Sequence, residues 1–424
     1  MPSATSILQH ATPDQLEQAA AQNHTALFFG EAIAHHGEVI EQKGISWTCA
    51  GEEPHGMVAF PTLTEDRVGP VLDGMMDYFR EHKLRSSGCW SLSPAQPSSL
   101  GARLLARGFQ PGWRPCWMSL DLHEMNADHP APAALKVYKS SIDLSDKRGL
   151  PNAGPHSALS WQHLQHDPEH AHQFVAELDG QIVAHAAIFL TTGEYGVAGV
   201  YNVGVLPFLQ GRGIGKAVVA AACTYARQQG YRYAVLNGTG QRMYEQLGFT
   251  FISYGLTWWL SNRFVTHAPA VREVAIAEAV ALGNTTALET FRGFLTTDTI
   301  NDPICNRMTL VQLAVHCKQP VACEWLIQHG AAFSVLDAWD IGWPERAAAL
   351  LAARPELVNE KYGEWECTLL HTAAERDDIA LAELALSAGP DLSITDKIYH
   401  NTALGWAQHL ERAAIVAMIE KHKG

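Results

Sequence analysis

The feature that most constrains this chain is a loop with three glycines in five residues, at 211–215. An apolar strand pattern leads to it through Pro207, and an apolar-periodic helix pattern follows from Ala217 to Gln229. The glycines remove side chains that would hold an anion away from the backbone, so that successive N–H groups can converge on a phosphate. The positive end of the following helix faces the same anion. The stretch predicts a phosphate-binding strand–loop–helix unit, with a tight turn that binds no ligand as the alternative.

Two common phosphate-binding loops do not fit the residues. A Walker loop needs Ser or Thr after its lysine, and here Ala217 follows Lys216, so the hydroxyl that would hold magnesium is missing. A dinucleotide fingerprint needs a third glycine, and Val218 stands at that position. Both classes of nucleotide site are therefore disfavoured.

The loop instead resembles the Gln/Arg-x-x-Gly-x-Gly/Ala loop of the GNAT (Gcn5-related) N-acetyltransferases, which here reads Gln210-Gly211-Arg212-Gly213-Ile214-Gly215. A second signature of that family, Tyr-x-x-Leu-Gly-Phe, is matched by 244–249 at the family's spacing. The resemblance implies an α/β fold with a mixed central sheet and flanking helices over residues 133–262. It also implies that the chain uses acetyl-coenzyme A as its acyl donor.

By this resemblance, the loop binds the diphosphate of acetyl-coenzyme A, and the end of the preceding strand pairs with the pantetheine where two central strands separate. An opening in a sheet offers backbone donors and acceptors to the amides of the pantetheine. The end of the next strand often contacts the pantetheine or the substrate. The residues implied to bind the cofactor are Val203, Gly204, Val205, Gln210, Gly211, Arg212, Gly213, Ile214, Gly215, Lys216 and Asn237.

The reaction implied is direct attack of a neutral amine on the acetyl carbonyl, with coenzyme A leaving as a thiolate. Tyr244 matches the family tyrosine that protonates the departing sulfur, although it would also suit a core position. Gly199 stands where many family members carry a glutamate base. Glu194 is a candidate base acting through water, and the alternatives are an ordered water alone or an amine that arrives neutral.

Five histidines fall between 156 and 172. A His-x-x-His spacing can hold zinc, but no cysteine or third fixed ligand accompanies these residues. We predict no metal site and expect histidines on the surface near the mouth of the substrate site. They are His156, His163, His166, His170 and His172.

Residues 1–125 predict a further α/β domain, followed by a proline-rich linker at 126–132. Leu104-Leu105-Ala106-Arg107-Gly108-Phe109 resembles the second GNAT signature, which suggests a degenerate GNAT-like domain that helps to wall the substrate cleft. At the position that corresponds to the glycine-rich loop, residues 60–69 contain one glycine and two acidic residues. Their negative charge would repel a diphosphate, so this half should not bind one. An unrelated α/β domain is the alternative.

Residues 274–424 predict an all-α domain of repeats. Thr368-Leu369-Leu370-His371-Thr372-Ala373-Ala374 and Thr402-Ala403-Leu404-Gly405-Trp406-Ala407 begin 34 positions apart, and 309–314 carries a similar motif. The pattern resembles an ankyrin solenoid, in which stacked helix pairs build a continuous core. A generic helical domain is the alternative.

Composition limits the partners and the compartment. The formal charge is −14, and no basic run exceeds two residues, so we expect no nucleic-acid partner. No run of eighteen apolar residues appears, so we expect no membrane span. The first residues lack the blocks of an export signal, and the eight cysteines form no Cys-x-x-Cys pair. These features favour a cytoplasmic protein with reduced thiols.

The sequence therefore supports two hypotheses about function. The first is an acetyl-coenzyme A-dependent N-acetyltransferase that modifies an amine of a small molecule. The second is a protein-directed acetyltransferase, or an acyl-coenzyme A-sensing scaffold, whose ankyrin repeats recruit a polypeptide partner. Fold alone does not choose between them.

Overall fold

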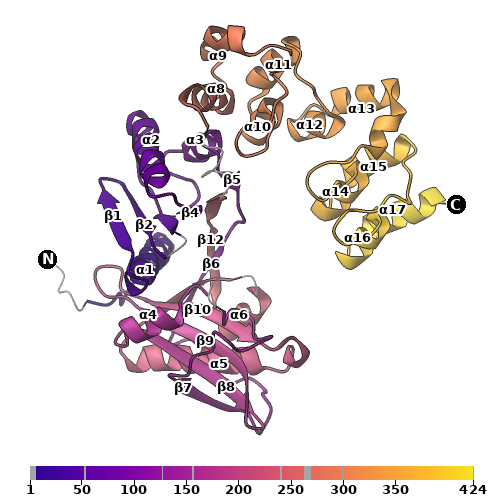
Figure 1. Ribbon diagram of the computed structural model, residues 1–424. Coiled ribbons are helices and arrows are strands. Elements are labelled where there is room, and N and C mark those ends of the chain that lie inside the picture. The colour runs from indigo at the N-terminus through magenta and orange to yellow at the C-terminus, as the bar shows by residue number, and fades with distance from the viewer. Residues whose placement is uncertain are drawn as a thin grey trace. The chain divides into compact units, whose positions relative to one another are not determined.

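The computed structural model describes residues 6–51, 54–126, 128–154, 157–238, 241–261, 269–297 and 299–423. The chain divides into two compact units, Met1–Pro269 and Ala270–Gly424. The first unit is α/β and the second is helical (Figure 1). No helix in the described part of the chain is long and apolar enough to cross a membrane.

A six-stranded sheet organises the first part of the α/β unit, with α1 (Pro13–Ala34), α2 (Glu65–Glu81) and α3 (Leu100–Ala106). Thr12 caps α1: its side chain accepts a hydrogen bond from the backbone of Gln15, and the Gln15 side chain returns one. The mixture of helices and strands predicted for residues 1–125 is observed here. The strands, in sheet order, are β1 (Glu38–Gln42), β2 (Ile45–Cys49), β3 (His55–Ala59), β4 (Ser86–Ser91), β13 (Leu256–Leu260) and β5 (Gln110–Pro111).

A seven-stranded sheet carries the glycine-rich loop. Two of its long strands form a hairpin with the turn at Asp179 and Gly180, a residue pair typical of such turns. Figure 1 shows α5 (Ile214–Gln228) lying along one face of this sheet. The strands, in sheet order, are β12 (Thr250–Tyr254), β6 (Cys116–Asp121), β11 (Tyr233–Asn237), β10 (Ala198–Val205), β9 (Gln181–Leu190), β8 (Ala171–Leu178) and β7 (Lys136–Ser140).

The two sheets exchange strands. β6 leaves the first part of the chain and lies between β11 and β12 of the second sheet, where it pairs antiparallel with both. In return β13 leaves the second part and lies between β4 and β5 of the first sheet. Neither sheet is therefore continuous without a strand from the other, which the sequence did not predict.

Helix α1 joins the two sheets at the opposite face of the second sheet from α5. Its residues Ala19, Ala20 and Phe28 pack with Trp90 of the first sheet and Trp117 of the exchanged strand. Farther along, Leu27 packs against the second sheet together with α4 (Trp161–His166). The first helix of the chain is thus part of the wall of the sheet that bears the loop.

The prediction that the helix after the loop begins at Ala217 is wrong, because α5 begins at Ile214. Its first turn contains Gly215, which contributes nothing to an apolar period, and this hid the start of the helix. Val218, Val219, Ala222 and Cys223 form its buried face.

The second unit consists of short helices that pack in antiparallel pairs (Figure 1). Side chains of Thr309, Ser334 and Thr402 cap the first helices of three pairs by accepting a hydrogen bond from the backbone N–H three residues on. The helices are α8 (Val271–Ala281), α9 (Thr285–Phe291), α10 (Leu310–His316), α11 (Pro320–Gln328), α12 (Val335–Asp340), α13 (Pro344–Ala353), α14 (Leu369–Arg376), α15 (Ile379–Ser387), α16 (Ala403–His409) and α17 (Ala413–Lys423). The described residues also form three 3-10 turns, η1 (Pro207–Leu209) in the first unit and η2 (Arg292–Phe294) and η3 (Pro355–Asn359) in the second.

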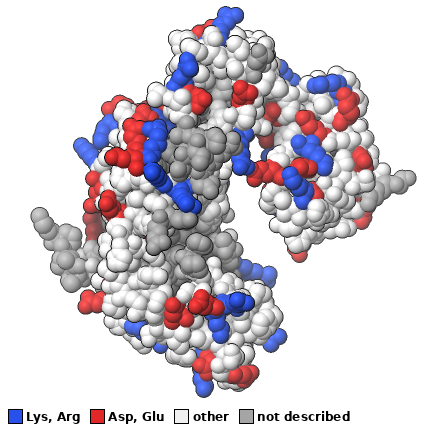
Figure 2. All heavy atoms as spheres, viewed as in Figure 1, with Lys and Arg blue, Asp and Glu red and all other residues white. Residues whose placement is uncertain are grey.

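Surface charge is mixed. On the face that Figure 2 shows, Lys and Arg side chains lie among Asp and Glu side chains, so the net negative charge is not gathered into a single patch. All eight cysteines are free thiols.

Candidate active site

The glycine-rich loop ends in a helix whose N-terminus has no side-chain cap. Gly213 occupies the N-cap position with φ 81°, and among the described residues no side chain accepts a hydrogen bond from the first turn of α5. An added Cβ at Gly213 would lie 1.9 Å from the carbonyl oxygen of Pro130, in the predicted linker. Only glycine suits a left-handed backbone in so close a contact. The first N–H groups of α5 are thus left for an external acceptor.

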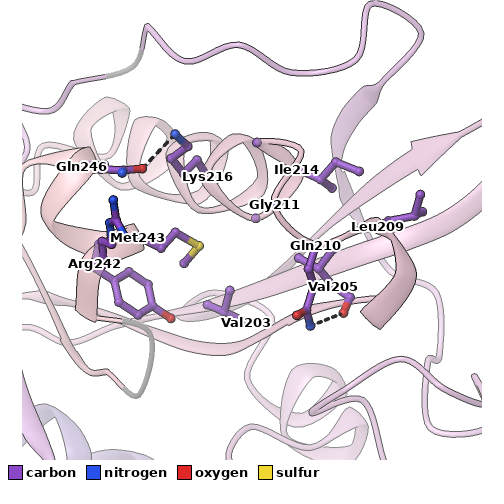
Figure 3. A pocket seen from close by; sticks show the side chains of 13 residues that line it. Val203, Val205, Leu209, Gln210, Gly211, Ile214, Lys216, Arg242, Met243 and Gln246 are labelled. Carbon is purple, nitrogen blue, oxygen red and sulfur yellow. Dashed lines mark hydrogen bonds between the residues drawn. The ribbon is translucent and has the colours of Figure 1, made fainter. Parts of the chain in front are cut away.

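These N–H groups open onto a pocket of about 650 Å³. Its walls come from the end of β10, the loop, the first turn of α5, and α6 (Gln241–Leu247). In the close view of Figure 3, Lys216, Arg242 and Gln246 lie together at one side of the pocket, and the Lys216 ammonium donates to the Gln246 side chain at 3.0 Å. The pocket therefore combines helix amides with two cations, which suits a phosphorylated ligand.

β10 is bulged and leaves its neighbour at the mouth of this pocket. It pairs parallel with β11 only at Ala198 and Gly199. Against β9, Tyr201 lies opposite Ala187 but Gly204 lies opposite His185, so β10 contains one extra residue. Asn202, at the bulge, has φ 51°. The backbone of 203–205 is consequently not paired with β11, as the resemblance implied.

Tyr244 lies on α6 at the wall of the pocket and is 8% exposed. Burial raises the pKa of its phenol to about 12, with a smaller contribution from Cys223. No hydrogen bond of its hydroxyl to any described residue is found. The phenol is protonated at neutral pH and its donor is unused, which suits hydrogen bonding to a developing anion.

A second, smaller cavity of about 180 Å³ lies against the other face of the bulge. Asn202 and Val203 are successive residues of β10, so their side chains point to opposite faces, the first toward this cavity and the second toward the larger pocket. Asn202 holds the backbone of Leu159 through both its side-chain atoms, at 2.6 and 3.3 Å. Asn152 donates to the carbonyl of Val203 at 2.9 Å. Polar loop residues thus fix the bulge from the side away from α5.

His185 adds a buried imidazole to this second cavity. Its Nε2–H donates to the carbonyl of Pro151 at 2.7 Å, and its Nδ1 has no hydrogen-bond partner among the described residues. Burial lowers the pKa of His185, and the bond to Pro151 only partly opposes this. The ring is therefore neutral at pH 7, with a free lone pair on Nδ1.

A buried network from α1 fills the position of the missing strand glutamate. A Cβ on Gly199 would lie 2.0 Å from Oδ1 of Asn23, so no larger side chain fits there. Asn23 is fully buried, and its Oδ1 accepts from the hydroxyl of Tyr201 at 2.6 Å. His24 lies 3.2 Å from the same hydroxyl. The absence of a glutamate at 199 is thus explained by α1, which the sequence assigned to a different domain.

Other predicted site residues lie outside the larger pocket. Arg212 is exposed and does not line it, whereas Arg242 does. Asn237 ends β11, where it pairs with Trp117, and does not line the pocket either. Glu194 is an exposed residue of the turn before β10, at the end of that strand away from the loop.

The prediction of surface histidines is wrong for two of the five. His163 is fully buried and its Nδ1 lies 3.1 Å from Glu31 of α1. His172 is 4% exposed and contacts the hydroxyl of Tyr225 at 3.1 Å. His156 lies outside the described residues. No group of three or more potential metal ligands is found in the described part of the chain.

Sequence reasoning missed the residues that act from outside the loop. Leu209, Arg242, Met243 and Gln246 all line the larger pocket. A signal was available for α6, because Gln246 follows Arg242 by four positions and Met243 by three, so that Gln246 shares a helix face with both. Asn23 offered a weaker signal, because it is a polar residue among the apolar residues Ala19, Ala20 and Leu27 at helical spacing.

Comparison with known proteins agrees with this geometry. Residues 142–249 match the model of the acetyltransferase (GNAT) family. The chain is similar to an uncharacterized N-acetyltransferase, YjgM, of Escherichia coli K12, with 29% identity over 136 residues, 30% of this chain and 80% of that protein.

Solved structures of low identity are also similar to the chain. A GCN5-related N-acetyltransferase from Kribbella flavida has 17% identity and a TM-score of 0.44, covering 57% of this chain and 95% of its own. A tandem GNAT protein from the clavulanic acid biosynthesis pathway has 13% identity and a TM-score of 0.40, and the match covers 62% of this chain and 98% of that protein. The similarity to acetyltransferases rests on the family match of residues 142–249 rather than on these structures.

Proposed function

We propose that the protein is an acetyl-coenzyme A-dependent N-acetyltransferase that acetylates an amine of a small molecule. The observation that carries the proposal is the uncapped N-terminus of α5, which opens onto a pocket that also contains Tyr244 and the unpaired end of β10. Along this one pocket, the N-terminus of α5 suits the diphosphate, the unpaired end of β10 suits the pantetheine, and Tyr244 suits the thioester.

The donor would lie with its diphosphate on the amides of Gly213, Ile214 and Gly215, beside Lys216 and Arg242. Its pantetheine would pair with the backbone of 203–205. The carbonyl of Val203 already accepts from Asn152, but a carbonyl oxygen has a second lone pair for the ligand. The loop thus positions the acetyl group at the bulge before any chemistry begins.

The amine would approach from the opposite face, through the cavity that contains Asn152, His185 and Asn202. Attack on the acetyl carbon forms a tetrahedral oxyanion, which backbone N–H groups at the bulge would stabilise. One such donor typically contributes about 3 kcal/mol to the transition state. Collapse expels the thiolate of coenzyme A, to which the Tyr244 hydroxyl would donate.

The amine would lose its proton to an ordered water or arrive neutral. Glu194 lies at the other end of β10, so a role as base would need a chain of waters along that strand. The Asn23 side chain at Gly199 excludes a direct carboxylate base from the usual strand position.

The helical unit supports a second candidate, a transferase directed at a polypeptide that ankyrin repeats recruit. Nδ1 of His371 accepts a hydrogen bond from the Thr368 hydroxyl (2.8 Å) within its own helix pair, and its Nε2–H donates to the carbonyl of Asn401 (3.1 Å) in the next. Such a link between successive pairs is what a stacked array requires. We propose that the protein acts in the cytoplasm, where both acetyl-coenzyme A and a polypeptide partner would be present.

The decisive experiment has two arms, because binding and chemistry fail separately. Calorimetry with acetyl-coenzyme A should show saturable uptake, and a thiol-release screen over polyamines, amino acids, aminoglycosides and peptides should show turnover with one class. No uptake of any acyl-coenzyme A would refute the transferase. Turnover that requires a polypeptide and residues 274–424 would favour the second candidate.

A further inference from the structure

The helical unit contains a pocket of its own, of about 410 Å³, whose walls are mainly aromatic. Trp365 comes from the turn before α14, Tyr399 from the loop before α16, and Trp406 from α16 itself. Glu375, near the end of α14, supplies a carboxylate to the same pocket. Residues of two successive helix pairs therefore converge on this pocket.

The three rings are steeply inclined to one another. Trp365 and Tyr399 are 5.6 Å apart at 82°, Trp365 and Trp406 are 5.9 Å apart at 72°, and Tyr399 and Trp406 are 6.4 Å apart at 67°. Each pair is therefore an edge-to-face contact, and the three rings line the pocket at different inclinations, whereas a planar ligand would need parallel faces. The shape suits a compact, roughly spherical group.

The pocket is held in place without a ligand. Asp396, which is fully buried, accepts hydrogen bonds from the backbone of Ile398, Tyr399 and Asn401 and from the indole N–H of Trp406. Burial alone would raise the pKa of Asp396, but these bonds outweigh it and hold the pKa well below its usual range. The backbone N–H of Lys397 also donates to the carbonyl of Trp365 at 2.8 Å, which ties the two loops together.

Large apolar surfaces nevertheless remain exposed at the rim. Trp365 is 44% exposed and Tyr399 is 66% exposed. The exposed parts of these rings add no apolar burial to the fold, and contiguous exposed apolar surface is typical of a binding site. Their arrangement is better explained by a ligand that covers them.

Charge selects the sign of that ligand. The carboxylate of Glu375 forms no hydrogen bond or ion pair with any described residue, whereas Lys397 and Arg412 are paired with Glu366 and Asp377. Residues 270–424 contain 21 Asp and Glu against 12 Lys and Arg. Ring faces carry partial negative charge, so rings and carboxylate together attract a cation.

We propose that this pocket binds a methylated ammonium group. The methyl groups would contact the faces of Trp365, Tyr399 and Trp406, and the diffuse positive charge would lie beside Glu375. A bare lysine ammonium is strongly hydrated and loses more hydration free energy than a methylated one on entering an aromatic site. A guanidinium is planar and suits parallel ring faces. The group can belong to a methylated lysine of a polypeptide or to a free quaternary amine.

The test uses the full chain and three probes: choline, a peptide with one trimethyllysine, and 3,3-dimethylbutan-1-ol, the neutral carbon analogue of choline. Ligand-observed NMR on the methyl signals gives the dissociation constants. We expect at least one cationic probe to bind at least about tenfold more tightly than the neutral analogue. Binding of the peptide but not choline would assign the site to a polypeptide, and the reverse to a free amine.

Variants test whether the pocket residues, rather than the surface around them, bind the probes. Trp365→Leu should raise the dissociation constant of the cationic probe by about tenfold or more, and Glu375→Gln should raise it by a few fold. Phe294→Leu, which alters another half-exposed aromatic side chain of the same unit, should change nothing. Glu375 is exposed, so its variant keeps the test valid should Trp365→Leu misfold. Equal binding of cationic and neutral probes, or none by either cation, would overturn the proposal.

Discussion

Tyr244 and Tyr231 are a matched pair of buried phenols that differ in what they face. Burial raises the pKa of each to about 12, but only Tyr244 lines the larger pocket. We expect Tyr244→Phe to lower kcat by roughly 10- to 100-fold at unchanged affinity for acetyl-coenzyme A, because the departing thiolate loses its donor. Tyr231→Phe should retain the wild-type rate in the same thiol-release assay. Equal rates in both variants would remove Tyr244 from the mechanism.

Arg242 and Arg212 form a second pair. Both are exposed, but only Arg242 lines the pocket beside Lys216. Loss of a charged hydrogen bond to a phosphate weakens binding by about 1–2 kcal/mol. Calorimetry should therefore show Arg242→Ala raising the dissociation constant of acetyl-coenzyme A about tenfold and Arg212→Ala less than about threefold. The reverse order would place the diphosphate outside the loop, toward solvent.

His24 makes stability depend on pH. Burial lowers the pKa of His24 to about 3, so between pH 3 and 6.5 the unfolded chain binds a proton that the folded chain does not. The contribution of His24 is fully present above pH 6.5 and is lost as the pH falls. From pH 7 to 5 this amounts to about 2 kcal/mol. Urea unfolding should show a smaller loss over that range in His24→Asn, and an equal loss in both proteins would contradict the assignment.

At the scale of elements, the loop and the start of α5 act as one structure. Gly211 and Gly213 have φ of 76° and 81°, but only Gly213 contacts Pro130. An alanine at either position costs about 1 kcal/mol of backbone strain, and at 213 it must also displace the linker. We expect Gly213→Ala to weaken acetyl-coenzyme A binding at least about tenfold more than Gly211→Ala. Similar affinities in calorimetry would show that the linker does not hold the loop.

Local signals predicted most elements and the loop, because spacing and turn residues act within a few positions. The glycines at 211–215 and the signature at 244–249 identified the pocket without any knowledge of its neighbours. The same logic failed where a partner is distant. β6 and β13 are both short and largely apolar, and nothing in such a pattern says which sheet a strand will join. The Asn23 contact at Gly199 likewise joins residues far apart in the chain.

At the scale of the whole molecule, the strand exchange limits how the chain can be divided. Residues 133–262 include β11 and β12 but not β6, which lies between them. That fragment would expose two unsatisfied strand edges, a common cause of aggregation. We expect residues 133–262 to be insoluble or unfolded when expressed alone, and 1–269 to give a folded protein by near-ultraviolet circular dichroism. A folded 133–262 fragment with acetyl-coenzyme A affinity would contradict this expectation.

The same exchange governs the response of the molecule to force. Since β6 and β13 each lie in the opposite sheet, a pull that unfolds one half of the chain also removes a strand from the sheet of the other half. In an optical trap the α/β unit should lengthen in a single rupture, whereas two independently built sheets would give way one after the other. The two halves are also coupled in evolution, because a substitution that weakens an exchanged strand destabilises the sheet formed mainly by the other half of the chain.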